Sequence, residues 1–292
     1  MKELVVVSGK GGTGKTSIAA SIAALASGKV VADCDVDAAD LHLVLSPTVV
    51  RSEPFVGGAR ARIVEDACTG CGACLDACRF DAITCRSVEG RAVCRVDPLG
   101  CEGCGVCSIV CADGAVLMEE VESGTLYVSE SRLGPFVHAR LGIAEENSGK
   151  LVTLVRQEAK KVASERGLDL VLIDGSPGIG CPVIASMTGV SLALVVTEPT
   201  LSGMHDLKRV CGVAETLRAR VAVCINKWDL NADVADAIAE WCDGKGLTLV
   251  GRVPYDGSVT DAQLSALSVV ESSQGPAATA IRGVWERTSE LL

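Results

Sequence analysis

Short runs of consecutive apolar residues recur along the chain, separated by segments with helical spacing. The first run, Val5–Ser8, is followed by a glycine-rich loop, an alanine-rich helix over Thr16–Ala26 and a second run at Val30–Cys34. Two such strands joined by a helix form a βαβ unit with parallel strands. Further strands are predicted at Leu170–Ile173, Leu192–Val196, Val221–Ile225 and Leu247–Val253, and further helices at Asn147–Arg166, Ser202–Leu217, Ala232–Cys242 and Ala277–Leu291. The pattern predicts an α/β fold with a mostly parallel sheet flanked by helices.

The α/β rhythm is interrupted between residues 61 and 118 by a stretch rich in Cys and Gly. This stretch is internally duplicated with a period of 33, because Cys68, Gly70, Cys71, Gly72, Cys74, Cys78 and Ala82 recur as Cys101, Gly103, Cys104, Gly105, Cys107, Cys111 and Ala115. We therefore expect a small α+β domain at 61–118, inserted into a discontinuous domain formed by 1–60 and 119–292. After the insertion, Glu122-Ser123-Gly124 predicts a hairpin turn, with Thr125–Ser129 as the returning strand.

Composition narrows the classes of function. No run of 18 apolar residues occurs and the first strand begins at once, so we expect a cytoplasmic chain without a signal peptide or spanning helix. Fifteen cysteines in such a chain indicate metal or redox chemistry rather than a disulfide framework. The net charge of −10 argues against nucleic acid as a partner, because phosphate binding needs a basic face.

The glycine-rich loop fits the P-loop pattern Gly9-x4-Gly14-Lys15-Thr16 and has the strand before it and the helix after it that this pattern requires. Glycines allow the backbone N–H groups to wrap a phosphate, and the helix N-terminus adds a favourable dipole. Lys15 is expected to reach the β- and γ-phosphates and Thr16 to bind Mg²⁺. The residues predicted to bind the nucleotide at this loop are Gly11, Gly12, Thr13, Gly14, Lys15, Thr16 and Ser17.

Acidic and amide side chains follow the later strands. Asp33 and Asp35 come directly after the second strand, and Asp174 ends the strand over Leu170–Ile173 as the expected Walker B acid. Carboxylates at the carboxyl ends of parallel strands face the nucleotide crevice. Asn226-Lys227-Trp228-Asp229 follows another buried strand and fits the NKxD guanine-recognition pattern.

Each copy of the duplication has the spacing Cys-x2-Cys-x2-Cys-x3-Cys, which is typical of bacterial [4Fe–4S] ferredoxins. The fourth cysteine of such a run binds the other cluster. We therefore assign cluster one to Cys68, Cys71, Cys74 and Cys111, and cluster two to Cys101, Cys104, Cys107 and Cys78. Zinc is the alternative metal, although zinc sites normally use paired Cys-x2-Cys hooks. Arg79 and Ala112 stand where a proline usually follows the fourth cysteine.

Seven cysteines lie outside these runs, and most are expected to be small core residues. They are Cys34, Cys85, Cys94, Cys181, Cys211, Cys224 and Cys242.

With these motifs placed, the chain resembles MinD/ParA-superfamily P-loop ATPases that contain an inserted 2[4Fe–4S] ferredoxin domain, a group related to the nitrogenase iron protein and to Mrp/Nbp-type carriers. The resemblance covers nearly the whole length. It is carried by Gly9–Thr16, Asp33–Asp37, both cluster motifs, Glu145–Leu151, Asp174–Pro182, Thr197–Thr200 and Asn226-Lys227. It implies ATP binding with Mg²⁺, slow hydrolysis without a partner, and a homodimer that forms on ATP binding.

The resemblance also implies roles for single residues. Lys10 would cross the dimer interface to the partner's nucleotide, although a solvated loop lysine is the alternative. Asp35 would orient the attacking water, and Asp33 would support its loop or Mg²⁺. Gly178 would sense the γ-phosphate through its N–H. The implied catalytic set is Lys10, Lys15, Asp35 and Asp174, with Asn226 and Lys227 at adenine and Thr16 and Asp33 at Mg²⁺.

Cys181 lies at the offset of an inter-subunit cluster ligand in the nitrogenase iron protein, while an isolated thiol is more often inert.

Three functions compete. The first is a nucleotide-switched dimer that couples ATP to electron transfer or to a redox-dependent interaction, with an unidentified redox protein or a related ATPase subunit as its partner. The second is an iron–sulfur or metal-cofactor carrier ATPase, and the third is a MinD/ParA-like spatial organiser. A membrane is not an expected partner, because the last helix has too few basic residues and is expected to pack on the core.

Overall fold

The computed structural model describes residues 1–88, 91–142 and 148–292. Its chain divides into two compact units. The first comprises Met1–Glu53, Leu126–Leu141 and Ser148–Leu292. The second is built mainly from Pro54–Thr125.

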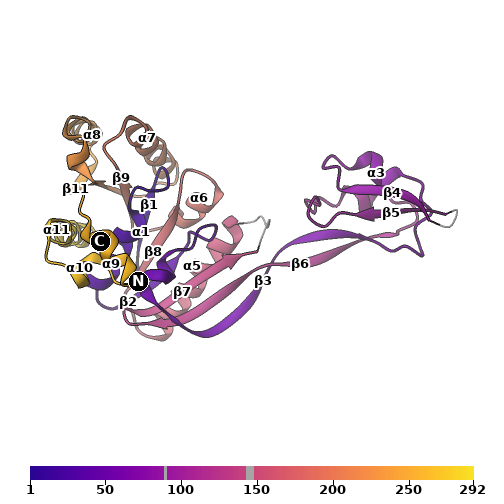
Figure 1. The fold of residues 1–292 in the computed structure, drawn as a ribbon, viewed down its shortest axis with the longest axis horizontal. Helices are drawn as coiled ribbons and strands as arrows, with labels where there is room; N and C mark the ends of the chain where they lie inside the picture. Colours follow the sequence, from indigo (N-terminus) through magenta and orange to yellow (C-terminus); the bar gives the residue numbers. More distant parts are fainter. Residues whose placement is uncertain (89–90, 143–147) are drawn as a thin grey trace. The chain divides into compact units, whose positions relative to one another are not determined.

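A sheet of nine strands, counted over the described residues, has the order β11-β10-β9-β1-β8-β2-β7-β6-β3 (Figure 1). Its strands are β1 (Lys2–Ser8), β2 (Lys29–Asp33), β3 (Thr48–Ile63), β6 (Val116–Ser131), β7 (Gly134–Leu141), β8 (Leu170–Pro177), β9 (Leu192–Thr197), β10 (Val221–Asn226) and β11 (Thr248–Val253). The strand pairs from β7 to β11 in this order are parallel. The predicted α/β fold with a mostly parallel sheet is therefore confirmed.

The central strand β1 pairs with β8 on one side and β9 on the other, and each residue from Glu3 to Ser8 is buried. A strand covered on both faces must be apolar along its length, which explains the unbroken run at Leu4–Val7. Because the neighbouring strands are parallel, the carboxyl ends of β1, β2, β8, β9 and β10 lie at one edge of the sheet. All the predicted nucleotide motifs follow these five strands.

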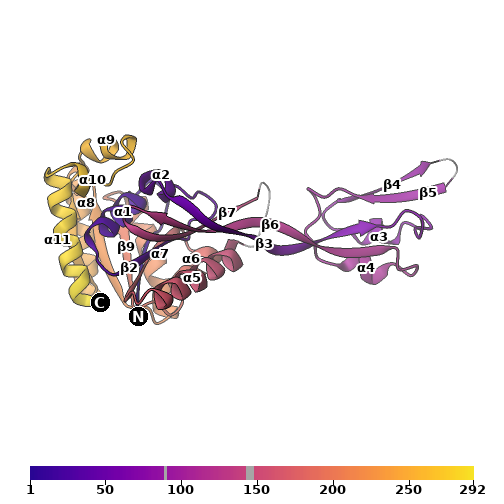
Figure 2. The same ribbon diagram turned by 90° about the horizontal axis from the view of Figure 1, so that it is seen from below.

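Helices cover both faces of this sheet (Figures 1 and 2). They are α1 (Lys15–Leu25), α2 (Leu41–Leu45), α5 (Ser148–Glu165), α6 (Cys181–Met187), α7 (Leu201–Thr216), α8 (Ala232–Gly244), α9 (Ser258–Leu264), α10 (Val269–Ser272) and α11 (Pro276–Leu291), with a 3-10 turn η1 at Trp228–Leu230. Helices α1, α10 and α11 share one hydrophobic core with the sheet, while α5, α6 and α7 contact β2, β8 and β9.

The last helix packs on the core, as predicted. In α11, Ala277, Ala278, Ile281, Val284 and Thr288 are buried, so its apolar stripe is used within the fold. Among the described residues, no helix is long and apolar enough to cross a membrane.

Arg156 ties three elements of the first unit together. This buried side chain on α5 donates from Nη1 to the carbonyl oxygens of Ala185 (2.5 Å) and Thr188 (2.9 Å), and from Nη2 to Glu3 Oε1 on β1 (2.9 Å). Lys160 Nζ pairs with the other oxygen of the same carboxylate, Glu3 Oε2, at 2.8 Å. These contacts neutralise the buried carboxylate of Glu3 and satisfy the end of α6, although Arg156 Nε itself has no partner among the described residues.

The turn predicted at Glu122-Ser123-Gly124 is wrong. Strand β6 runs unbroken through it, and Ser123 is buried, with its carbonyl accepting from Gly142 N–H at 2.8 Å. The chain turns instead at Arg132 and Leu133, immediately before β7. Because β6 has hydrogen-bonded neighbours on both sides, sheet pairing outweighs the local turn preference of Ser and Gly.

The second unit contains two short helices and a hairpin. Helices α3 (Ala73–Ala77) and α4 (Val106–Val110) occupy matching places in the two copies of the duplication. Each follows a left-handed glycine, Gly72 (φ 80°) or Gly105 (φ 76°), and each ends at the fourth cysteine of its run. The hairpin pairs β4 (Ile83–Val88) antiparallel with β5 (Arg91–Val96).

Cysteines form much of the core of the second unit. Its buried cluster consists of Ala61, Ile63, Cys68, Cys74, Ile83, Cys94, Cys107, Ala115 and Val116. Cys85 and Cys94, opposite each other in the hairpin, are joined by a disulfide. This pairing was not predicted, because the apolar pattern did not predict the hairpin that brings the two thiols together.

Candidate functional site

The P-loop joins the end of β1 to the start of α1. Gly12 and Gly14 have φ values of 80° and 87°, a region that residues with a side chain rarely adopt. A Cβ on Gly14 would lie 2.2 Å from Asn226 Nδ2, whereas one on Gly12 would meet nothing within 4 Å. The loop therefore needs glycine at position 14 for both its backbone angle and its close approach to the end of β10.

Lys15 lies among acids at the start of α1. Its Nζ is 2.8 Å from Asp174 Oδ1 and 3.4 Å from Asp35 Oδ2. Burial opposes charge on Lys15, but the carboxylates of Asp174 and Asp35 outweigh it and raise the lysine pKa. The structure thus brings together three predicted catalytic residues.

Two polar atoms near this lysine lack a partner. Thr13 Oγ1 and Asp174 Oδ2 are buried, and no hydrogen bond from the described residues reaches either. A buried polar atom left unpaired is costly, so these atoms suit a ligand or ion that supplies the missing contacts.

Asp33 is buried and holds the loop after β2. Its Oδ1 accepts from Asp35 N–H at 3.0 Å, and its Oδ2 accepts from Leu41 N–H at 3.3 Å. Burial and the nearby Asp174 raise the pKa of Asp33 well above its usual range. Both oxygens therefore already support the loop, and a direct contact with Mg²⁺ stays a prediction.

Asp35 is in a different position from Asp33. Its carboxylate reaches the cavity beside the P-loop, and burial raises its pKa although the neighbouring Lys15 acts in the opposite direction. A carboxylate with a raised pKa is a better proton acceptor near neutral pH.

A cavity of about 550 Å³ opens beside the loop. It is lined by Ser8, Gly11, Gly12, Thr13, Gly14, Lys15, Thr16, Ser17, Asp35, Ala38, Asp40, Pro177, Asn226, Lys227, Pro254, Tyr255, Asp256, Val259, Thr260 and Gln263. All seven loop residues predicted to bind nucleotide are in this lining, together with Asn226 and Lys227. Lys10, Asp33, Asp174 and Gly178 are not.

Sequence reasoning missed the contribution of α9 to this cavity. Val259, Thr260 and Gln263 line it, and Gln263 Nε2 donates to Ser17 Oγ at 2.9 Å. One sequence signal pointed to this region. The segment Pro254-Tyr255-Asp256 directly follows β11, so it lies at the same edge of the sheet as the P-loop and leads into α9.

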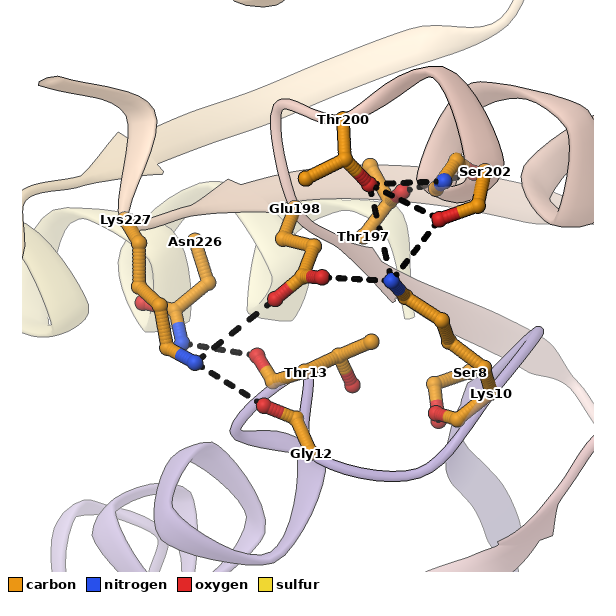
Figure 3. A network of polar contacts seen from close by, with 11 residues as sticks. Ser8, Lys10, Gly12, Thr13, Thr197, Glu198, Thr200, Ser202, Asn226 and Lys227 are labelled. Carbon is orange, nitrogen blue, oxygen red and sulfur yellow. Dashed lines mark hydrogen bonds and ion pairs between the residues drawn. The ribbon is translucent and has the colours of Figure 1, made fainter. Parts of the chain in front are cut away.

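Asn226 and Lys227 hold the P-loop from the end of β10 (Figure 3). Asn226 Nδ2 donates to Thr13 O at 2.8 Å, and Lys227 Nζ donates to Gly12 O at 2.9 Å. The two side chains therefore fix the loop backbone from one side, in addition to lining the cavity.

Lys10 points toward the start of α7 (Figure 3), and it is not among the residues that line the cavity. Its Nζ is 2.6 Å from Glu198 Oε1, 3.0 Å from Ser202 Oγ and 3.5 Å from Thr200 Oγ1. This lysine is therefore not a freely solvated loop residue in the described chain. Glu198 was noted in the sequence only as part of a matching run, so its contact with Lys10 was not predicted.

The segment after Asp174 continues β8 to Pro177 and then turns at Gly178, whose φ is 95°. Gly178 N–H donates to Ser8 O at 2.8 Å, and Ser176 Oγ donates to Cys34 O at 2.7 Å. The predicted γ-phosphate sensor is thus bonded to the end of β1. From the run Glu145–Leu151, residues Glu145, Glu146 and Asn147 lie outside the described residues.

The predicted cluster ligands line two small cavities in the second unit. One cavity is lined by Cys68, Cys71, Cys74 and Cys111, with Cys94 beside them. The other is lined by Cys78, Cys101, Cys104 and Cys107. These sets match the predicted interleaved assignment, in which each fourth cysteine joins the other copy. Within the described part of the chain, no three His, Cys, Asp or Glu side chains are grouped as a site for a metal ion.

The remaining thiols differ in exposure. Cys34, Cys224 and Cys242 are fully buried, and burial raises the pKa of each, which makes them inert. Cys211 is half-buried, and Cys181 is exposed at the start of α6.

Comparison with known proteins agrees with this geometry. A family model described as the CobQ/CobB/MinD/ParA nucleotide binding domain matches residues 4–269. The chain is 38% identical over 235 residues to the uncharacterized protein MJ0578 of Methanocaldococcus jannaschii, covering 78% of this chain and 79% of that protein. It is 25% identical over 263 residues to MJ0579 of the same organism, covering 79% and 83%.

Solved structures show the same fold at low sequence identity. MinD of Pyrococcus horikoshii, complexed with Mg-ADP, has a TM-score of 0.60 at 17% identity, with 99% of this chain and 96% of that chain covered. The McdA–ATP complex of Cyanothece has a TM-score of 0.57 at 18% identity, with 99% and 96% covered. The chain therefore belongs to the family described as the CobQ/CobB/MinD/ParA nucleotide binding domain.

Proposed function

We propose that this protein is a nucleotide-dependent switch that couples ATP to an iron–sulfur unit. MgATP binds beside the P-loop, two copies associate when ATP is bound, and the second unit carries two [4Fe–4S] clusters. The partner is a redox protein or a related ATPase subunit, and hydrolysis is slow without it. The observation that carries the proposal is that each predicted four-cysteine set lines a cavity of its own.

The residues at the P-loop edge fit a magnesium nucleotide. Thr13 Oγ1 and Asp174 Oδ2 are buried atoms that lack a partner among the described residues, and the loop backbone faces a cavity large enough for a ligand. Thr16 and Asp174 are the candidates to hold Mg²⁺, which supplies charge neutralisation for the phosphates.

Within this site, the chain's own residues have separable tasks. Lys15, which now neutralises Asp174 and Asp35, binds the phosphates. Its transfer to the phosphates leaves Asp35 free to orient a water molecule and accept its proton. The raised pKa of Asp35 favours that acceptance.

The cysteine sets fit clusters better than single ions. A zinc ion draws four sulfurs to about 2.3 Å from one point and normally uses paired Cys-x2-Cys hooks, whereas each run here has three cysteines at that spacing before its fourth. A four-iron cluster is held by four thiolates on a larger body and supplies one-electron transfer. The cavities of about 10 and 20 Å³ hold about one water molecule each, so cluster binding must spread the cysteine turns.

The proposal also assigns domains. Residues 61–118 form a ferredoxin-like domain, and residues 1–60 and 119–292 form the ATPase domain. The assignment is supported by the separate compact unit built mainly from Pro54–Thr125 and by its matching helices α3 and α4.

Electron paramagnetic resonance tests the proposal. The full-length protein is reconstituted anaerobically, reduced with dithionite and titrated by potential with and without MgATP. Two interacting [4Fe–4S]⁺ signals whose potentials shift with MgATP are expected. Clusters that ignore MgATP would contradict the coupling, and zinc in place of iron would contradict the iron–sulfur assignment.

A spatial organiser is the second candidate, favoured by the solved MinD and McdA structures that match nearly the full chain. At 17–18% identity these matches support the fold alone. The buried apolar stripe of α11 also leaves that helix without a free membrane-binding face. A fluorescent fusion tests this candidate. ATP-dependent patterning in cells that is lost in Lys15→Met but kept in Cys74→Ser would favour it, and a uniform distribution of the wild type would contradict it.

A further inference from the structure

Lys10 is held inside its own chain by the segment between β9 and α7. An ammonium group has three donors, and the three oxygens around Lys10 Nζ, on Glu198, Thr200 and Ser202, lie within 3.5 Å (Figure 3). Its donors are thus already occupied. A lysine in this state cannot bind a second anion unless the contact with Glu198 is broken.

Glu198 binds two lysines at once. Its Oε1 is 2.6 Å from Lys10 Nζ, and its Oε2 is 3.6 Å from Lys227 Nζ, which also donates to Gly12 O (Figure 3). One carboxylate therefore connects the beginning of the P-loop, through Lys10, with its middle, through Lys227.

The Glu198 backbone is fixed by its neighbours. Thr200 Oγ1 accepts from Gly203 N–H at 2.9 Å, and Thr197 Oγ1 donates to Gly203 O at 3.1 Å. A Cβ on Gly203 would lie 2.3 Å from Glu198 O, so glycine at this position lets the helix start pack directly on the segment. The carboxylate thus projects from a rigid turn.

The contact is suited to being broken. The side chains of Lys10 and Glu198 are 30% and 17% exposed, and ion pairs with this access to solvent contribute about 0–1 kcal/mol. A triphosphate carries far more negative charge than one carboxylate, so it can compete for both lysines at this edge of the sheet.

We propose that Glu198 is a latch that holds Lys10 within its own subunit and restrains ATP-dependent dimerisation until it is released. The latch rests on the proposed function, in which Lys10 contacts the nucleotide of a second copy. Glu198 is accordingly a positioning residue, because it acts through Lys10 and does not line the nucleotide cavity.

The direct test uses Glu198→Gln, which keeps the side-chain shape and removes its charge. In nucleotide-free protein, the acylation rate of Lys10 by an amine reagent is measured by peptide mass spectrometry, with the exposed Lys245 as the internal reference. Faster labelling of Lys10 in the variant is expected, because its strongest partner is lost. Glu240→Gln, which removes one exposed carboxylate elsewhere, is the matched control and should label as wild type. Unchanged Lys10 labelling in Glu198→Gln overturns the latch.

The second readout is the dimer dissociation constant at saturating MgATP, from analytical ultracentrifugation. Each latch is expected to contribute about threefold, and a dimer releases two, so Glu198→Gln should tighten association about tenfold. In a Lys10→Met background the same change should give no tightening, because the latched residue is absent. A constant unchanged by Glu198→Gln, or an equal effect in both backgrounds, overturns the latch.

These readouts separate the latch from the proposed function. If wild-type protein binds MgATP yet stays monomeric at any concentration, the dimer switch fails, and the latch as a restraint on dimerisation fails with it. If wild-type protein dimerises and Glu198→Gln behaves as wild type in both readouts, only the latch fails.

Discussion

The two compact units solve the problem of a stable core in opposite ways. The first buries long runs of Val, Leu and Ile on both faces of a parallel sheet, and its buried charges, such as Lys15 with Asp174, satisfy one another. The second has two five-residue helices and one hairpin, and cysteines fill much of its core. Small cores seldom suffice without disulfides or metal. The comparison suggests that the first unit can fold without its ligand, whereas the second depends on what its cysteines bind.

The largest expected effect is the loss of stable structure in the second unit alone, caused by removing one predicted cluster ligand. Cys74→Ser should remove cluster one and with it about half the iron, since one of two clusters loses a ligand. Hydrogen exchange should then accelerate across 61–118 and stay slow in β1 and β8. Iron analysis and exchange mass spectrometry measure this on anaerobic protein.

Cys224→Ser is the control for this prediction. It changes a buried thiol of the first unit and should leave the iron content unchanged. Full protection of 61–118 in Cys74→Ser would show that the second unit does not need its ligands.

The next effect tests the mutual neutralisation in the first unit. Lys15→Met leaves Asp174 and Asp35 without their cation, and breaking a buried pair costs about 3–5 kcal/mol. We expect a loss of about 3 kcal/mol in urea unfolding of the nucleotide-free protein and no measurable MgATP binding.

Asp174→Asn in the Lys15→Met background should recover part of this stability, because it removes the charge left buried. A double variant as unstable as Lys15→Met would mean that the charge is not the cause.

A smaller effect compares two glycines of the P-loop. Gly12→Ala should cost about 1 kcal/mol from its left-handed backbone alone. Gly14→Ala adds a contact at 2.2 Å with Asn226 Nδ2, so it should cost at least 1 kcal/mol more and disturb the bond from Asn226 to Thr13. Thermal unfolding of the two variants measures the difference, and equal losses would show that Asn226 can move aside freely.

The smallest expected effect is a pH dependence at His138. This ring stacks on Phe136 and Tyr127, and burial, together with the nearby His42, lowers its pKa to about 4. The unfolded state therefore binds more protons between pH 6.5 and 4, and stability falls as pH falls through that window. We expect this to lower the free energy of unfolding by about 1–2 kcal/mol. That is less than the full pKa shift would give, because the ring is partly exposed.

His138→Phe keeps a stacked ring and should remove this contribution from the difference between urea unfolding at pH 7 and at pH 4.5. His205→Gln, at an exposed position, is the control and should keep it. An unchanged pH dependence in His138→Phe would contradict the assignment.

Much of the nucleotide edge could be predicted because its signals are local. The P-loop motif consists of eight consecutive residues, so it can be recognised directly in the sequence. Once the strands are known to be parallel, the acids that follow the later strands are expected at the same edge of the sheet. The contact of Lys10 with Glu198 could not be predicted, because residues 188 positions apart meet only through the order of β9 and β1. The part of the cavity lined by α9 could not be predicted for the same reason, because α9 and the P-loop are far apart in the sequence.

Errors in the prediction came from local signals that tertiary pairing overrides. Ser123 and Gly124 favour a turn, yet hydrogen-bonded neighbours on both sides keep β6 extended. Cys85 and Cys94 looked like isolated thiols because only their hairpin register sets them opposite each other. The two interleaved cysteine sets that line the cavities of the second unit follow from the duplication, while their role as cluster ligands stays a prediction.

Arg156 has a mechanical consequence for the segment that follows Asp174. Its bonds to Ala185 and Thr188 fasten the end of α6 to α5, so the two helices shift as a single lever. Movement at Gly178 cannot be absorbed by sliding between them. A displacement of Pro177, which lines the cavity, is thus passed through α6 to α5 within the first unit.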